Sequence, residues 1–336
     1  MVGLPGAGLD AETSRRLAAL GACGVILFRR NLVEPAQTVD LLARAAAVLQ
    51  DPALFAIDQE GGKVSRIEPW IGATPTAAQL HGMGVGAITR FGIATGNALG
   101  GLGFNLDFAP VVDLCAPDAP NGIGNRSFSP DPADAARSAG AFLNGLQSTG
   151  VAGCLKHFPG LGDTAVDSHV ELPTVTRSRK VLEEQDLLPY RELAARTAAV
   201  MVGHAHYTAL DGETPCPATC SPVVVRDWLR ERVGFDGLAV SDDLEMGAVA
   251  PRDVDGQAAI DAVEAGLDLL LYCADLDRAE TAVERLTLAA AENAAFAARL
   301  RQAAEKVDVI SRLWPAPVAD LDRFESARIE LQRLSG

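Results

Sequence analysis

Short apolar runs alternate with longer segments of helical spacing along most of this 336-residue chain. Most of these runs are almost wholly apolar, which is typical of parallel strands that helices cover on both faces. Eight such units predict a (β/α)8 barrel of the TIM type, and a doubly wound open sheet is the alternative. The runs that predict strands cover residues 21–28, 53–58, 103–110, 151–158, 198–205, 217–221, 237–243 and 266–273. The run at 217–221 gives the weakest signal of the eight.

The tail from about residue 275 is rich in alanine and has helical spacing. Pro315 and Pro317 interrupt that spacing, because proline ends helices. No linker rich in glycine, serine or proline divides the sequence. We therefore expect one barrel domain over residues 1–336, with closing helices over about 275–336 that pack on the barrel.

The net charge of −15 excludes partners that require a basic surface. We therefore expect no nucleic-acid partner and no membrane partner. No run approaches the roughly 18 apolar residues of a membrane-spanning helix, and the first residues lack the features of a signal peptide. The six cysteines have no zinc-site spacing and are typical of thiols in a reducing compartment. These features predict a cytoplasmic protein. The sequence does not reveal the oligomeric state, and a monomer is the default expectation.

Titratable residues stand at or just after the ends of five predicted strands. In a barrel of this type the carboxyl ends of all strands meet at one face, where active sites lie. Five strands with the same feature predict a single polar pocket. The residues concerned are Asp58, Glu60, Asp107, Asp113, Lys156, His157, His204, His206, Asp242 and Asp243.

The loop after the fourth predicted strand reads KHFPGLGDTAVDSH, residues 156–169. Lys156 and His157 follow the buried strand directly, so their side chains should project into the pocket. Asp167 and His169 can hydrogen-bond at their i, i+2 spacing. A carboxylate on one imidazole nitrogen orients the ring and leaves the other nitrogen for proton transfer. An exposed polar loop is the alternative for this pair taken alone.

Two aspartates end the seventh predicted strand, in the segment SDDLEMGA. A carboxylate at this place can act as a nucleophile, a metal ligand or a helix N-cap. Two adjacent carboxylates allow both kinds of role, with one of Asp242 and Asp243 facing the pocket and the other capping the next turn.

Several long segments, in the right order, resemble the motifs of the single-domain bacterial β-N-acetylglucosaminidases of glycoside hydrolase family 3. They are GVILFRRN (24–31), AIDQEGGKVSR (56–66), GFNLDFAPVVD (103–113), IGNRSFSPDP (123–132), KHFPGLGDTAVDSHVELP (156–173) and GFDGLAVSDDLEMGA (234–248).

The resemblance implies a retaining exo-β-N-acetylglucosaminidase that needs no cofactor. Asp242 would be the nucleophile, and His169, oriented by Asp167, the general acid/base. This departs from the usual pair of carboxylates in retaining glycosidases. The substrate would be a small carbohydrate with terminal β-linked N-acetylglucosamine, from peptidoglycan fragments; chitobiose and glycoconjugates stay open. The residues implied to bind the sugar are Asp58, Arg66, Arg126, Lys156 and His157.

Three positions depart from the family pattern. Leu161 stands where the family has a second loop histidine, Asn125 where it has aspartate, and Lys63 where it has arginine. None of these is the implied nucleophile or acid/base. They leave the reaction in place and put the substrate preference in question.

Four alternatives stay open at this point. An imidazole acid/base would repel phosphate less than a carboxylate does, so the enzyme could be a phosphorylase. His204 and His206 could bind zinc in a metal-dependent barrel hydrolase. The pocket could belong to a sugar-binding protein without catalysis. The acetamido group of the substrate could replace Asp242 as the nucleophile.

Overall fold

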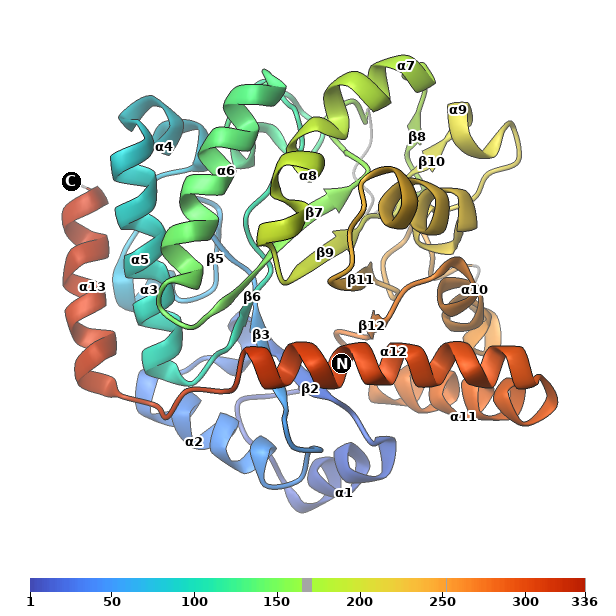
Figure 1. Ribbon diagram of the computed structural model, residues 1–336. Helices are drawn as coiled ribbons and strands as arrows, with labels where there is room; N and C mark the ends of the chain where they lie inside the picture. Colours follow the sequence, from blue (N-terminus) through green and yellow to red (C-terminus); the bar gives the residue numbers. More distant parts are fainter. Residues whose placement is uncertain (165–170, 252, 336) are drawn as a thin grey trace.

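The computed structural model describes residues 1–164, 171–251 and 253–335 (Figure 1). Eight parallel strands follow one another around a barrel in the order β1-β2-β3-β6-β7-β9-β11-β12. Val2 bridges Tyr272, and Gly3 N–H donates to the Tyr272 carbonyl at 2.8 Å, so the first strand meets the last. The predicted (β/α)8 barrel is confirmed. The strands are β1 Val2–Gly3, β2 Gly24–Leu27, β3 Leu54–Ile57, β6 Leu106–Asp107, β7 Ala152–Phe158, β9 Ala199–Val202, β11 Leu238–Asp243 and β12 Leu269–Leu271.

The prediction of a strand at 217–221 is wrong. Ala218–Cys220 forms the 3-10 helix η5. Pro217 and Pro222 flank this stretch and have no N–H to give to a sheet. The missing barrel position is filled by β1, whose two residues are too few to show any periodicity. The run at 21–28 therefore supplies the second strand of the barrel, not the first.

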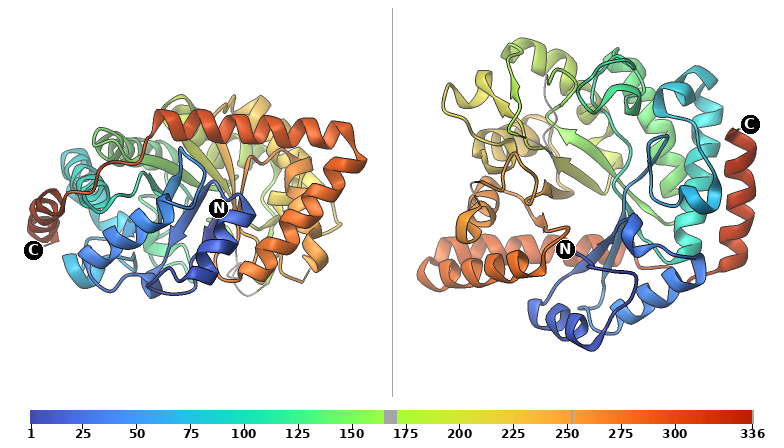
Figure 2. Two further views of the ribbon diagram at one scale, coloured as in Figure 1. Left: turned by 90° about the horizontal axis from the view of Figure 1, so that it is seen from below. Right: turned by 180° about the vertical axis from the view of Figure 1, so that it is seen from behind.

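Helices occupy the connections between strands and surround the barrel (Figures 1 and 2). The sequence sets their starts: α6 begins at Pro132, directly after Asp131, whose side chain accepts the Asp134 N–H at 2.9 Å. The α-helices are α1 Ala11–Leu20, α2 Pro35–Ala46, α3 Glu68–Ile71, α4 Ala77–Met83, α5 Val85–Leu102, α6 Pro132–Gln147, α7 Arg179–Val181, α8 Leu188–Leu193, α9 Thr208–Asp211 and α10 Gln257–Ala265. The 3-10 and π-helical segments are η1 Arg29–Asn31, η2 Gly124–Arg126, η3 Leu182–Asp186, η4 Ala194–Arg196, η5 Ala218–Cys220, η6 Val223–Arg232 and η7 Val254–Gly256.

Two apolar clusters form the core. One fills the inside of the barrel with side chains such as Ile26, Phe108 and Val240. The other lies between the outer face of the strands and the helices around them. The register keeps inward-facing residues level across the strands, since Ala199 pairs with both Cys154 and Leu238.

Three helices follow the last strand: α11 Leu276–Glu292, α12 Ala294–Leu313 and α13 Leu321–Ser335. Val307 and Ile310 of α12 join the cluster inside the barrel and close its amino-terminal end (Figure 2). Helix α13 packs against α5, where the Arg323 side chain bonds Asn97 at 3.0 Å and the Thr149 carbonyl at 2.8 Å. Helix α12 thus contacts the barrel interior, and α13 contacts α5.

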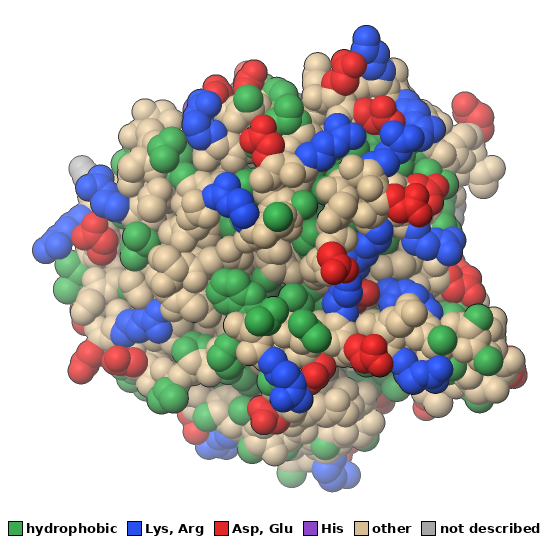
Figure 3. All heavy atoms as spheres, in the orientation of Figure 1, with side chains coloured by type: hydrophobic (Ala, Val, Ile, Leu, Met, Phe, Trp, Pro, Cys, Tyr) green, Lys and Arg blue, Asp and Glu red, His purple; other side chains and the backbone are tan. Residues whose placement is uncertain are grey.

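The surface mixes both signs of charge. On the face shown in Figure 3, basic and acidic side chains alternate over the outer helices. Within the described ranges, no helix has the length and apolar content needed to cross a membrane.

Candidate active site

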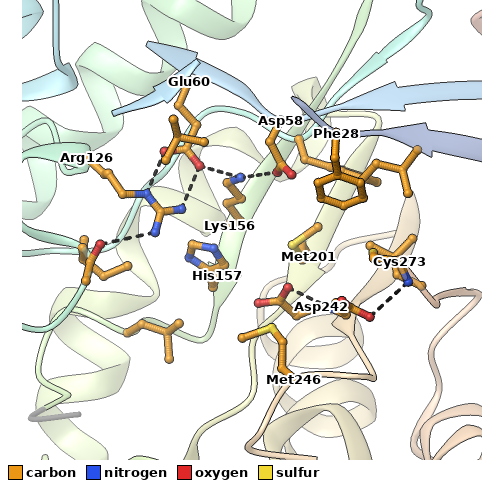
Figure 4. A pocket seen from close by; sticks show the side chains of 18 of the residues that line it. Phe28, Asp58, Glu60, Arg126, Lys156, His157, Met201, Asp242, Met246 and Cys273 are labelled. Atoms are coloured by element: carbon orange, nitrogen blue, oxygen red, sulfur yellow. Dashed lines mark hydrogen bonds and ion pairs between the residues drawn. The ribbon is translucent and has the colours of Figure 1, made fainter. Parts of the chain in front are cut away.

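A polar pocket of about 300 Å³ opens at the carboxyl ends of the strands (Figure 4). Side chains from β2, β9 and β12, together with residues that follow β3, join those of β7 and β11 in lining it. The five side chains expected to bind sugar all line this one pocket, and so does the expected nucleophile Asp242. Asp167 and His169, the expected acid/base pair, lie outside the described residues.

Glu60 is the centre of a buried charge cluster in the pocket. Its carboxylate accepts two bonds from Arg126, at 2.8 Å from Nε and 2.7 Å from Nη2. Lys156 Nζ lies 2.6 Å from Glu60 Oε1 and 2.9 Å from Asp58 Oδ1. Arg66 Nη2 contacts the other oxygen of Asp58 at 3.4 Å. The cluster thus joins three cations to two carboxylates, and only 2% of the Lys156 side chain is exposed.

The cluster keeps its members charged. Burial alone would raise the pKa of Glu60, but Arg126 and Lys156 outweigh it and hold that pKa well below its ordinary value. Burial would likewise raise the pKa of Asp58, yet the neighbouring Lys156 and Arg66 lower it. Burial would lower the pKa of Lys156, and the two carboxylates raise it instead. These charged side chains form the floor of the pocket and can bind neutral hydroxyl groups of a ligand well, because charge-assisted hydrogen bonds are stronger than neutral ones.

The local backbone explains where Glu60 lies. The segment DQEGGKVS (58–65) forms a tight antiparallel pair, β4 Gln59–Gly61 with β5 Val64–Ser65. Gly61 and Gly62 have φ values of 97° and 54°, a region that glycine adopts without strain. The turn thus brings Glu60 and Arg66 to the same rim.

His157 is held from behind by Asp113, a residue that the sequence interpretation placed near the pocket without a role. The Asp113 side chain is fully buried, and its Oδ2 lies 2.7 Å from His157 Nδ1. Its Oδ1 accepts the backbone N–H of Leu161 at 2.7 Å and that of His157 at 3.2 Å. Since a carboxylate only accepts, Nδ1 of His157 carries the proton and Nε2 is left for the pocket.

Asp242 and Asp243 both line the pocket and differ in their hydrogen bonds. Asp242 Oδ1 accepts the Asp243 N–H at 2.9 Å, and the described residues supply no other hydrogen bond to this carboxylate. Asp243 Oδ1 accepts the N–H groups of Glu245 at 3.1 Å and Cys273 at 3.3 Å, which fixes the turn after β11. Burial raises the pKa of Asp243 to about 6, and the charges of Glu245 and Asp242 add to this.

The two histidines after β9 make protein contacts. His204 lies 2.8 Å from the Asp243 carbonyl through Nε2 and 2.8 Å from Thr219 Oγ1 through Nδ1. His206 Nδ1 accepts the N–H of Cys216 at 3.2 Å. His204 thus supports the turn beside Asp242, and both of its ring nitrogens are engaged. Residues 1–164, 171–251 and 253–335 contain no group of three or more His, Cys, Asp or Glu arranged to hold a metal.

Sequence reasoning assigned no role to Glu60 or Asp113. Glu60 stands two residues after Asp58, and that spacing in an extended segment places both side chains on one face. This signal was available. Asp113 has no such signal, because its partners His157 and Leu161 are distant in sequence. Leu161, the departure from the family pattern, lines the pocket and is buried.

Known proteins resemble this chain in sequence and in fold. The family model described as the glycosyl hydrolase family 3 N-terminal domain matches residues 3–307. The beta-hexosaminidase of Tolumonas auensis is 37% identical over 278 residues, which are 81% of this chain and 82% of that protein. The beta-hexosaminidase of Idiomarina loihiensis is 34% identical over 281 residues, 82% of this chain and 83% of that protein.

Solved structures give the same picture. A glycoside hydrolase family 3 beta-N-acetylglucosaminidase from Paenibacillus sp. superposes with a TM-score of 0.87 at 32% identity, over 100% of this chain and 67% of that one. NagZ from Neisseria gonorrhoeae, in complex with N-trifluoroacetyl-D-glucosamine, superposes with a TM-score of 0.84 at 29% identity, over 100% of this chain and 97% of that one.

Proposed function

Because the chain belongs to glycosyl hydrolase family 3 and is therefore a glycoside hydrolase, we propose that it removes terminal β-linked N-acetylglucosamine with retention of configuration. One observation carries the proposal: the Asp242 carboxylate lines the same small pocket as the Asp58–Lys156–Glu60–Arg126 cluster and His157. The names of the relatives, beta-hexosaminidase and beta-N-acetylglucosaminidase, support this substrate class.

The size of the pocket supports action on a single terminal sugar. Its volume of about 300 Å³ is at the small end of ligand pockets, which span about 300–1,000 Å³. The charged floor offers donors and acceptors to sugar hydroxyls, and Nε2 of His157 adds one more polar contact. Apolar side chains, including Met201 and Met246, line other parts of the wall and can receive the acetamido methyl group.

The first chemical step would form a covalent bond between the enzyme and the sugar. Asp242 attacks the anomeric carbon and forms a glycosyl ester, while the bond to the leaving oxygen breaks. That oxygen takes a proton from His169, which Asp167 orients in this proposal. The Asp243 N–H holds one oxygen of Asp242, leaving the other for attack.

The second step would reverse the proton transfer. His169, now neutral, removes a proton from water as the water attacks the same carbon. The ester bond breaks, Asp242 recovers its electron pair, and N-acetylglucosamine leaves with the β-configuration. A group that must donate and then accept a proton needs a pKa near the working pH, and imidazole meets this need.

The natural substrate we propose is a fragment of peptidoglycan processed in the cytoplasm. Free thiols on all six cysteines are consistent with a reducing compartment. Purified peptidoglycan fragments, chitobiose and N-acetylglucosaminyl glycoconjugates, compared as substrates at equal concentration, distinguish the possible sources. Preference for chitobiose would overturn the peptidoglycan assignment while leaving the reaction in place.

Hydrolysis of an aryl N-acetyl-β-glucosaminide beside the matching aryl β-glucoside tests the function. We expect turnover of the first compound, little of the second, and β-configured sugar as the first product by NMR. Asp242→Ala should lower kcat on the order of 10⁴-fold. Running the reaction in phosphate and in a non-phosphate buffer separates hydrolysis from phosphorolysis, since only the latter yields a sugar phosphate. Preference for the glucoside, or an α-configured product, would overturn the proposal.

A further inference from the structure

The segment that carries Asp167 and His169 runs between two described stems. We call residues 159–164 the first stem and residues 171–177 the second stem. The first stem follows directly from β7, the strand that supplies Lys156 and His157 to the pocket. Any catalytic group between the stems therefore depends on how the stems are held.

The first stem is bonded to the barrel at successive residues. Tyr207 donates its hydroxyl to the Gly160 carbonyl at 2.7 Å. Leu161 N–H donates to Asp113 at 2.7 Å, and Asn121 Nδ2 donates to the Gly162 carbonyl at 2.9 Å.

The second stem is held by the same part of the barrel rim. Its strand β8 Thr174–Val175 pairs in parallel with β10 His206–Tyr207. The His206 N–H donates to the Pro173 carbonyl at 2.8 Å. Tyr207 thus contacts one stem through its backbone and the other through its hydroxyl.

Arg177 connects the two stems through side chains. Its Nη1 lies 2.9 Å from both carboxylate oxygens of Asp186, and its Nε lies 3.4 Å from Asp163 Oδ2. Asp163 belongs to the first stem. Asp186 ends the π-helical segment η3 (Leu182–Asp186) and lies against Gly160, where an added Cβ would meet its Oδ1 at 2.8 Å.

The two ion pairs of Arg177 differ in their surroundings. The side chain of Asp186 is 1% exposed, that of Arg177 21% and that of Asp163 42%. A buried pair is costly to break, because one partner is left as an uncompensated charge, whereas an exposed pair contributes little. The bond to Asp186 therefore fixes Arg177 beside Gly160 of the first stem, and the more exposed bond to Asp163 adds a weaker contact to that stem.

We propose that Arg177 is a positioning residue for the acid/base segment between the stems. It sets the distance between the stems, which restricts the conformations open to the connecting residues. The acid/base role of this segment rests on the proposed function. The link that Arg177 makes between the stems is independent of that function. Proton transfer needs the donor within about 2.6–3.2 Å of the leaving oxygen, and a misplacement of about 1 Å can cost on the order of 10²-fold in rate.

Arg177→Met tests the proposal through its dependence on the leaving group. Two aryl N-acetyl-β-glucosaminides are compared, one with a dinitrophenyl group, which departs without protonation, and one with an unsubstituted phenyl group, which requires it. We expect kcat/KM to fall on the order of 10²-fold for the phenyl substrate and only a few-fold for the dinitrophenyl substrate. An equal loss on both substrates would indicate general damage and overturn the positioning role.

Matched variants control for charge and folding. Arg179→Met removes a neighbouring arginine whose ion pair with Glu183 is exposed. This variant should leave kcat/KM unchanged for both substrates. Asp186→Asn should reproduce the leaving-group effect, and Asp163→Asn should do so more weakly. Arg177→Lys should rescue only part of it, because an ammonium lacks the planar fork through which the guanidinium reaches Asp186 with one nitrogen and Asp163 with another.

Hydrogen exchange gives a measurement that does not depend on activity. We expect backbone amides of both stems to exchange faster in Arg177→Met than in the wild type, and no change in Arg179→Met. Unchanged protection of both stems in Arg177→Met would overturn the link between them. If exchange responds but the wild type hydrolyses no glycoside, the link stands and the proposed function fails, together with the acid/base assignment.

Discussion

Substitution of Glu60 by glutamine removes the charge on which the floor of the pocket depends. The side chain is 5% exposed, and its two oxygens bond Arg126 and Lys156. Glutamine keeps the shape and one acceptor oxygen, but its amide N–H groups would face the donors of the arginine. The two cations then lose their shared carboxylate partner in a buried site.

The expected loss of stability follows from this geometry. Removing one partner of a buried ion pair typically costs about 3–5 kcal/mol. Lys156 keeps Asp58 at 2.9 Å, so we expect the lower end, about 3 kcal/mol. For 336 residues the entropy of unfolding is about 0.7 kcal/mol/K, which converts this loss into a fall in Tm of about 4 °C.

Scanning calorimetry of the wild type, Glu60→Gln and Glu68→Gln measures this effect. Glu68 is exposed on α3, and its substitution should change stability by less than about 0.5 kcal/mol. Because the charged floor is also the proposed sugar site, KM for an aryl N-acetyl-β-glucosaminide should rise in Glu60→Gln and stay constant in Glu68→Gln. A Tm for Glu60→Gln within 1 °C of the wild type would refute the reasoning.

Three further outcomes are expected. Asp243 has a pKa raised to about 6 by burial, so between about pH 4 and 6 the folded state keeps a proton that the unfolded chain has lost. The free energy of unfolding falls by at most about 3 kcal/mol as the pH rises through this window. Asp243→Asn should therefore raise Tm more at pH 7.5 than at pH 4. Equal changes in Tm at the two pH values would contradict the burial argument. Asp113→Asn weakens the charge-assisted hydrogen bond that orients His157. Steady-state kinetics should show KM raised about 10-fold with a smaller change in kcat. A fall in kcat alone would contradict this role for Asp113. A Cβ at Gly145 would lie 2.3 Å from a backbone carbonyl of α5, so Gly145→Ala should cost about 1–3 kcal/mol in denaturant unfolding, whereas Gly86→Ala, with nothing within 4 Å, should not destabilise.

The sequence predicted the fold well because the barrel strands are nearly continuous apolar runs. Seven of the eight expected strands are present, although 103–110 shortens to Leu106–Asp107. Periodicity failed at two places for physical reasons. Val2–Gly3 is too short to carry a pattern. The stretch at 217–221 begins with Pro217 and precedes Pro222, and neither proline has an N–H to give to a ladder.

The candidate site was predictable wherever a residue stands at the end of a strand. Asp58, Lys156, His157 and Asp242 meet there because parallel strands bring their carboxyl ends together. Arg126 came from the family motif alone, since η2 lies in a connection whose path no local pattern specifies.

Residues that position other side chains or loops through hydrogen bonds and ion pairs could not be identified from strand ends. The partners of Asp113 and Arg177 depend on tertiary packing between segments that sequence spacing does not relate. Asp167 and His169 lie outside the described residues, and their acid/base role stays a prediction.

Capture of the covalent intermediate tests the central claim most directly. The protein is mixed with a fluorinated N-acetyl-β-glucosaminyl donor that forms the glycosyl-enzyme faster than water releases it, and peptides are then mapped by mass spectrometry. We expect the mass of one sugar on the peptide that contains Asp242, and none in Asp242→Ala. Rapid turnover of the unmodified substrate with no adduct, or an adduct on another residue, would contradict the account.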